Sequence, residues 1–144
     1  MSSTTDALVK VIDIENAAIF AYGVSTAFIG TADRNAVGEY IAEHRVQRDQ
    51  AAASLTALGG KPPVSAAGYE LGVDVTGRDS AATVLLTAET DCARAYRALL
   101  EQSSVPDIRR QAVDALTGCA LRAARWRGVL GKTPVTEAFP GGAS

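Results

Sequence analysis

Residues 59–79 read GGKPPVSAAGYELGVDVTGRD, and this stretch decides how the chain folds. On both sides of it, apolar residues recur at intervals of three and four, the pattern of amphipathic helices that pack in a bundle. Only a few residues separate the two helices on each side, so each pair is expected to form an antiparallel hairpin. The four predicted helices cover residues 3–29, 33–58, 79–99 and 104–130.

The length of the 59–79 segment distinguishes two bundle topologies. A helix of about 25 residues is roughly 37 Å long, and 21 extended residues at about 3.3 Å each can span that length. The third helix can therefore run parallel to the second and lie diagonally across the bundle from it. Two hairpins joined by one long crossover make a ferritin-like, all-α four-helix bundle. An up-down-up-down bundle with a loose 59–79 loop is the alternative.

We predict a single bundle domain over residues 1–131 and an irregular tail over residues 132–144. The glycine pair at 59–60 is expected to end the second helix, and Gly131 to end the fourth. Polar residues near the predicted helix starts indicate the N-terminal caps. The expected capping residues are Ser3 with Asp6, then Asp33, Asp79 or Ser80, and Ser104 with Asp107.

Composition disfavours several classes of protein. The chain has 144 residues, and its 47% hydrophobic residues are enough to form one core. Its net charge of −2 disfavours a strongly basic nucleic-acid binder. No apolar run approaches the roughly 18 residues of a membrane span, and the N-terminus lacks the pattern of a secretory signal. A cytoplasmic protein is therefore expected. Cys92 and Cys119 do not have the common zinc spacings, and we expect two reduced, buried thiols close to each other.

Several short runs resemble a ferritin-like family of unassigned function found in actinobacteria. They are ENAAIFAYGV at 15–24, EHRVQRD at 43–49, TAETDCARAYRALL at 87–100, AARWR at 123–127 and AFPG at 138–141, with Tyr69 in the crossover. Their order and spacing cover nearly the whole chain. The resemblance implies the four-helix fold, leaves the activity open, and gives no catalytic residues.

Ferritin-like proteins often hold two iron or manganese ions through a glutamate from each of two helices and a Glu-x-x-His from each of the others. Glu15 and Glu89 could supply the glutamates. The only histidine, His44, has Ile41 three residues before it, and the fourth helix has no histidine. We therefore expect no di-iron centre and no cofactor. The alternative is a redox enzyme with an atypical iron or manganese site built from Glu15, His44 and Glu89.

Without a metal, His44 is expected to face the bundle interior and to form a hydrogen-bonded pair with Glu15. Such a polar pair can fix the register of packed helices at some cost in stability. Glu43, next to His44 in sequence, is expected at the edge of the bundle. The direction of any shift in the His44 pKa stays open, because a carboxylate raises it and burial lowers it.

The fourth helix is rich in arginine and contains the only tryptophan. Arg122, Arg125 and Trp126 could bind an anion or RNA, since guanidinium groups suit phosphate and an indole can stack on a base. The alternative is that these arginines coat the surface near a helix C-terminus. The sequence favours a metal-free binding or assembly module, a homodimer, over an enzyme. It disfavours a membrane or nucleic-acid partner.

Overall fold

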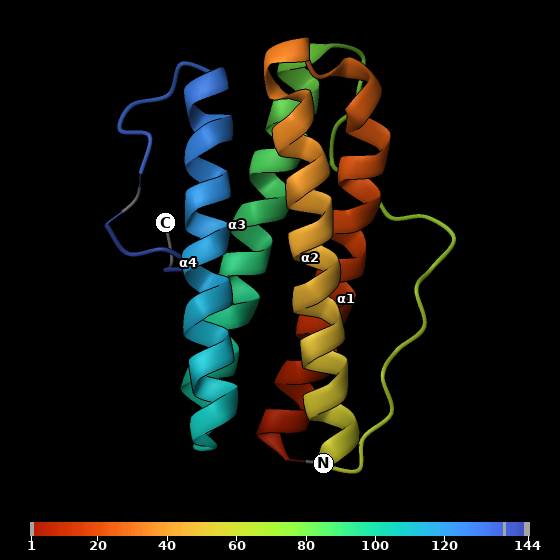
Figure 1. The fold of residues 1–144 in the computed structure, drawn as a ribbon, viewed down its shortest axis with the longest axis vertical. Coiled ribbons are helices and arrows are strands. Elements are labelled where there is room, and N and C mark those ends of the chain that lie inside the picture. The colour runs from red at the N-terminus through yellow and green to blue at the C-terminus, as the bar shows by residue number, and fades with distance from the viewer. Residues whose placement is uncertain (1, 137, 143–144) are drawn as a thin grey trace.

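The computed structural model describes residues 2–136 and 138–142, and the described part contains helices but no strand. Two long hairpins stand side by side in a four-helix bundle, as predicted (Figure 1). The helices are α1 (Ser3–Ser25), α2 (Thr31–Ala57), α3 (Arg78–Gln102) and α4 (Pro106–Val129), and a short 3-10 helix, η1 (Thr26–Phe28), follows α1.

The crossover between α2 and α3 runs along the full length of the bundle and returns to the end where α2 began (Figure 1). As a result, α2 and α3 run in the same direction. Helix α1 packs against both α2 and α3, and α3 packs against α4, whereas α2 and α3 lie on a diagonal. The predicted ferritin-like topology is confirmed, and the up-down-up-down alternative is wrong.

The crossover is attached to the bundle although it has no regular secondary structure. The Tyr69 ring lies against Phe20 of α1 with 5.8 Å between ring centroids, and Leu71 and Val75 pack against the core. At its start, Gly59 takes a left-handed φ of 84°, and a Cβ at Gly60 would lie 2.3 Å from Leu55 Cδ1. Both positions therefore favour glycine, and the prediction that this pair ends α2 is confirmed.

The helix starts differ from the predicted caps by one to three residues. The N-caps are Ser2, Gly30, Gly77 and Val105. The Ser80 hydroxyl lies inside α3, where it accepts hydrogen bonds from the backbone N–H groups of Thr76 and Gly77. Pro106 begins α4 because its fixed φ suits the first helical position and it has no N–H to satisfy. The first helix ends at Ser25, earlier than predicted, because the chain tightens into η1.

The buried apolar side chains form two clusters, one toward each end of the bundle. The first includes Leu8, Leu55, Leu99 and Ile108, and the second is built around Trp126 with Tyr22, Val37 and Leu85. Buried charged residues lie along the helices between them. This arrangement gives the bundle a charged layer at mid-height, where each helix contributes one residue.

Candidate functional site

The polar layer consists of Glu15 from α1, His44 from α2, Glu89 from α3 and Arg122 from α4. Glu15, His44 and Glu89 are fully buried, and Arg122 is 2% exposed. Burial of four charged groups is costly unless each is paired and hydrogen-bonded. The contacts within this layer therefore decide whether it is a stable structural element or a site open to a ligand.

His44 lies between the two glutamates. Its Nδ1 is 2.9 Å from Glu15 Oε2, and its Nε2 is 2.8 Å from Glu89 Oε2. Both ring nitrogens are therefore in hydrogen bonds with carboxylates, and an imidazole that donates from both nitrogens carries a positive charge. The prediction that His44 faces the interior and pairs with Glu15 is confirmed, and Glu89 is a second partner.

Arg122 extends the layer toward the groove between α2 and α4. Its Nε donates to Glu89 Oε1 at 3.0 Å, its Nη1 to Glu43 Oε2 at 2.6 Å, and its Nη2 to Gln47 Oε1 at 3.0 Å. The Gln47 amide in turn donates to Glu15 Oε1 at 2.9 Å, which closes a ring of contacts through all four helices. Glu43 is at the rim, half exposed, as predicted.

Two aromatic residues complete the shell of Glu89. The Tyr22 hydroxyl donates a short hydrogen bond to Glu89 Oε2, and Trp126 Nε1 donates to Tyr22 Oη at 2.9 Å. Burial, together with the charge of Glu89, raises the pKa of Tyr22 well above its ordinary value. The phenol therefore keeps its proton.

The pKa shifts in the layer favour the ionised forms. Burial by itself lowers the pKa of His44, but the neighbouring carboxylates, Glu89 foremost, raise it to about 10. Burial likewise opposes ionisation of Glu89, yet the charges of His44 and Arg122 lower the pKa of that carboxyl. Arg122 holds its proton more strongly than usual because Glu89 outweighs the cost of burial, so its pKa is raised. The polar layer is thus a set of ion pairs.

Local sequence explains how this layer fits between tightly packed helices. His44 and Gln47 are three residues apart and therefore share one face of α2. On α4, a Cβ at Gly118 would lie 3.0 Å from Arg122 Nη1 and 3.4 Å from Gln47 Oε1. Glycine at this position leaves room for the guanidinium group to turn inward.

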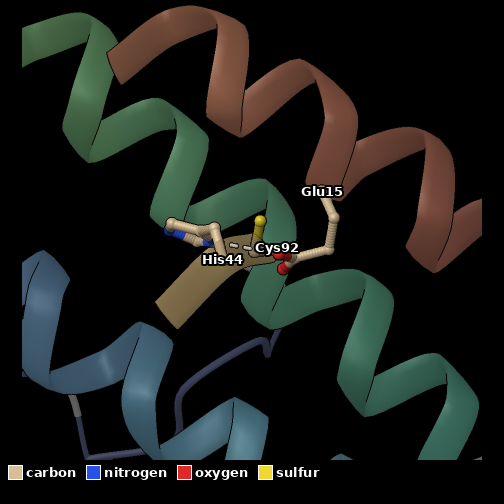
Figure 2. Close-up of side chains that lie close together, drawn as sticks. All are labelled: Glu15, His44 and Cys92. Atoms are coloured by element: carbon tan, nitrogen blue, oxygen red, sulfur yellow. Dashed lines mark hydrogen bonds and ion pairs between the residues drawn. The ribbon is translucent and has the colours of Figure 1, made fainter. Parts of the chain in front are cut away.

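A third potential ligand lies beside the Glu15–His44 pair. One potential ligand atom each from Glu15, His44 and Cys92 lies within 4.8 Å of the other two. Figure 2 shows these three side chains close together. The Cys92 thiol donates to the Ile14 carbonyl at 4.0 Å. A hydrogen bond with Cys119 and burial raise the pKa of Cys92 well above its ordinary value. The prediction of two reduced, buried and neighbouring thiols is confirmed.

These residues suit a metal poorly. A metal takes a neutral imidazole and a thiolate as ligands, and its binding must displace their protons. Here both nitrogens of His44 contact carboxylates, and the shifted pKa values of His44 and Cys92 favour the protonated forms. The charge of the two buried glutamates is also already balanced by His44 and Arg122. The donor set also does not match the paired Glu-x-x-His ligands of a di-iron bundle, because Ile41 stands three residues before His44 and α4 has no histidine.

The predicted anion or RNA surface is not formed. Trp126 is fully buried and Arg122 nearly so, which leaves neither available to stack on a base or to grip a phosphate. Arg125 is 40% exposed, but it donates to Asp33 Oδ1 at 2.8 Å and to Tyr40 Oη at 3.0 Å. The expectation of one exposed face from these three residues is corrected, because α4 turns two of them toward Glu89 and Tyr22.

Residues 7–144 match a family described as a domain of unknown function, DUF4439. This chain belongs to that family. A crystal structure of a conserved hypothetical protein, rv2844, from Mycobacterium tuberculosis is 36% identical, with a TM-score of 0.87 over 96% of this chain and 97% of that one. Among curated proteins, none matches the sequence.

Other solved structures share the fold at lower identity. A ferritin-like diiron-carboxylate protein from Bacillus anthracis is 14% identical, with a TM-score of 0.73 over 88% of this chain and 94% of that one. A dodecameric thioferritin related to bacterioferritin, from Bacteroides fragilis, is 19% identical, with a TM-score of 0.73 over 90% and 84%. These similarities establish that the DUF4439 chain has the ferritin-like fold. In the described residues, no helix has the length and hydropathy needed to cross a membrane.

Proposed function

We propose that this DUF4439 protein is a metal-independent ferritin-like bundle that acts as a binding or assembly module. The observation that carries the proposal is the double pairing of His44, whose ring nitrogens lie 2.9 and 2.8 Å from carboxylate oxygens of Glu15 and Glu89. An imidazolium at the centre of the bundle neutralises buried carboxylates, which is also what metal cations do in a di-iron bundle. Arg122 supplies the second positive charge.

The proposal includes self-association. The Bacteroides fragilis thioferritin is described as dodecameric, and in this chain Val46 of α2 and Leu121 of α4 are 55% and 66% exposed. Both side chains line the groove between these helices. Exposed apolar residues that line one groove are consistent with an interface between copies. Sedimentation velocity of the purified protein measures the oligomeric state directly, and a homodimer is the expected species.

Metal analysis tests the central proposal. The protein is purified without chelators, its metal content is measured, and it is then titrated with Fe²⁺ and Mn²⁺ under anaerobic conditions. We expect no stoichiometric metal and no saturable binding in the wild type. His44→Gln should lower the free energy of unfolding by about 1–3 kcal/mol, because buried carboxylates lose a charged partner, and it should leave metal content unchanged.

Arg45→Gln is the matched control, since Arg45 is the exposed neighbour of His44 on the same helix. It should change stability by less than about 0.5 kcal/mol. Stoichiometric iron or manganese in the wild type that is lost in His44→Gln but kept in Arg45→Gln would overturn the proposal. That result would favour the redox alternative built on Glu15, His44 and Glu89.

A further inference from the structure

A cavity of about 190 Å³ lies between the α3–α4 hairpin and the C-terminal segment. From the end of α4, the chain turns back and runs alongside that helix (Figure 1). The cavity walls include Thr90 and Ala93 of α3, Ala120 and Ala123 of α4, and Val135 and Pro140 of the C-terminal segment. The helices alone would leave an open groove here, and the returning segment covers part of it.

The C-terminal segment is held in place at both ends of the cavity. Near its start, the Lys132 N–H donates to the Arg127 carbonyl at 2.9 Å, and Arg127 Nε donates to the Pro134 carbonyl at 2.9 Å. Near its end, Gly141 has a left-handed φ of 76°, and a Cβ there would lie 2.6 Å from the Ala93 carbonyl oxygen. Glycine allows the segment to lie directly on α3. The cavity is therefore bounded by specific contacts.

The walls of this cavity are mainly apolar. Alanine, valine and proline side chains supply much of the surface, and three of the polar residues in the walls, Glu89, Thr90 and Arg127, already have partners. The Thr90 hydroxyl donates to the Leu86 carbonyl at 2.8 Å, and the Glu89 carboxylate is paired with His44 and Arg122. An apolar molecule would gain by leaving water for this space, whereas a charged one would have to compete with the partners that Glu89 and Arg127 already have.

The volume of the cavity limits the size of a ligand. An apolar cavity of about 150 Å³ in another protein holds one benzene molecule. A cavity of 190 Å³ accepts one aromatic ring or a compact bicyclic ring. We propose that the cavity between α3, α4 and the C-terminal segment is a binding site for a small apolar molecule of benzene to indole size. This inference rests on the proposed function, because it assigns a ligand class to the binding module.

Binding is tested by titrating the full chain with benzene and indole, with glycerol as a polar probe. Amide chemical shifts report both the affinity and the location. We expect saturable shifts at Ala93, Ala123 and Val135 with the two aromatic probes and none with glycerol. Ala123→Leu should weaken binding at least tenfold because the larger side chain fills the cavity.

Ala124→Leu is the matched control, since it makes the same change one residue away, at a position that does not line the cavity. It should bind indole like the wild type. Val135→Ala enlarges the cavity from its outer wall and should favour indole over benzene, which provides a test that does not depend on the folding of Ala123→Leu. Absence of saturable binding in the wild type, or equal binding by Ala123→Leu and Ala124→Leu, would overturn the inference.

The two proposals fail separately. Failure to bind benzene or indole removes the ligand class assigned to the cavity, while the metal content and the His44→Gln result still decide the metal-independent function. Conversely, a metal held by Glu15 and His44 would overturn that function. In that case the amide shifts of Ala93, Ala123 and Val135 would still report where benzene and indole bind, because none of these residues belongs to the polar layer.

Discussion

The polar layer and the C-terminal cavity are neighbours with opposite character. They share Glu89, which belongs to the polar layer and also adjoins the cavity, and Cys119 links them, because it adjoins the cavity and accepts a hydrogen bond from Arg122 Nη2. In the polar layer, His44, Glu89 and Arg122 have ionic partners on several sides. In the cavity, small apolar side chains leave a space that no side chain of the described residues fills. The polar layer is filled by paired charged side chains, whereas small side chains leave the cavity unfilled.

This difference indicates how adjoining parts of one bundle can serve two purposes, stability in the polar layer and ligand binding in the cavity. The ion pairs are directional and join all four helices, so they fix the relative positions of the helices. The cavity is bounded on one side by a segment without regular structure, where side-chain changes disturb fewer contacts. Stability should therefore be sensitive to substitutions in the polar layer, and ligand binding should be sensitive to substitutions around the cavity.

The largest expected effect is that of removing Arg122. Arg122→Met deprives Glu89, Glu43 and Gln47 of a donor and leaves a buried carboxylate with less compensation. Breaking a buried ion pair from one side costs about 3–5 kcal/mol. Urea unfolding should therefore show a lower midpoint with a similar slope.

Arg125→Met provides the comparison, because Arg125 lies three residues further along α4 and also makes an ion pair. Its partner is Asp33, and the arginine is 40% exposed. The loss of a partly exposed ion pair costs about 1 kcal/mol or less. Equal destabilisation by the two variants would contradict the view that the polar layer holds the helices together.

The second effect is a loss of stability at alkaline pH. The pKa of His44 is about 10 in the folded protein, compared with about 6.5 in an unfolded chain. The stabilisation from its charge is fully present below about pH 6.5 and is lost as the pH rises toward 10. Over this range the free energy of unfolding should fall by at most about 1.4 kcal/mol per pH unit.

Two neighbouring groups contribute with the same sign. The pKa values of Cys92 and Tyr22 are also raised in the folded state, so the unfolded chain loses their protons first as the pH increases. The contribution of His44 is therefore measured as the difference between the wild type and His44→Gln in urea unfolding at several values between pH 6 and pH 9. A difference that does not narrow as the pH rises would contradict a charged His44.

The fold could be predicted from the length of one segment of the sequence. Residues 59–79 are long enough to cross the bundle, and the short links on either side leave few other arrangements for two hairpins. Cap positions were less accurate because several polar residues occur near each helix start. Ser80, for example, bonds to the backbone ahead of α3 from inside the first turn.

The sequence predicted part of the polar layer. Glu15 and His44 could be paired from the sequence, because they lie at similar numbers of residues from the turn between α1 and α2. Arg122 was assigned to a surface because arginine is usually exposed, and the rotation of α4 about its axis could not be derived to the required accuracy. Two signals did exist: Arg122 lies three residues after Cys119 and four before Trp126, and Gly118 leaves space beside it. The tyrosine partner of Glu89 had no comparable signal.

The smallest expected effect is a difference between the two cysteines. Cys119 adjoins the cavity, whereas Cys92 lies between the Ile14 carbonyl and the polar layer. Both are fully buried, so labelling in the native protein requires local opening and should be slow compared with labelling in denaturant. Displacement of the C-terminal segment uncovers the α4 side of the cavity without breaking the ion pairs of the polar layer. Cys119 should therefore react a few-fold faster than Cys92, as measured by mass spectrometry after timed exposure to a maleimide. Rapid labelling of both thiols would contradict their burial, and faster labelling of Cys92 would show that the polar layer opens more readily than the cavity wall.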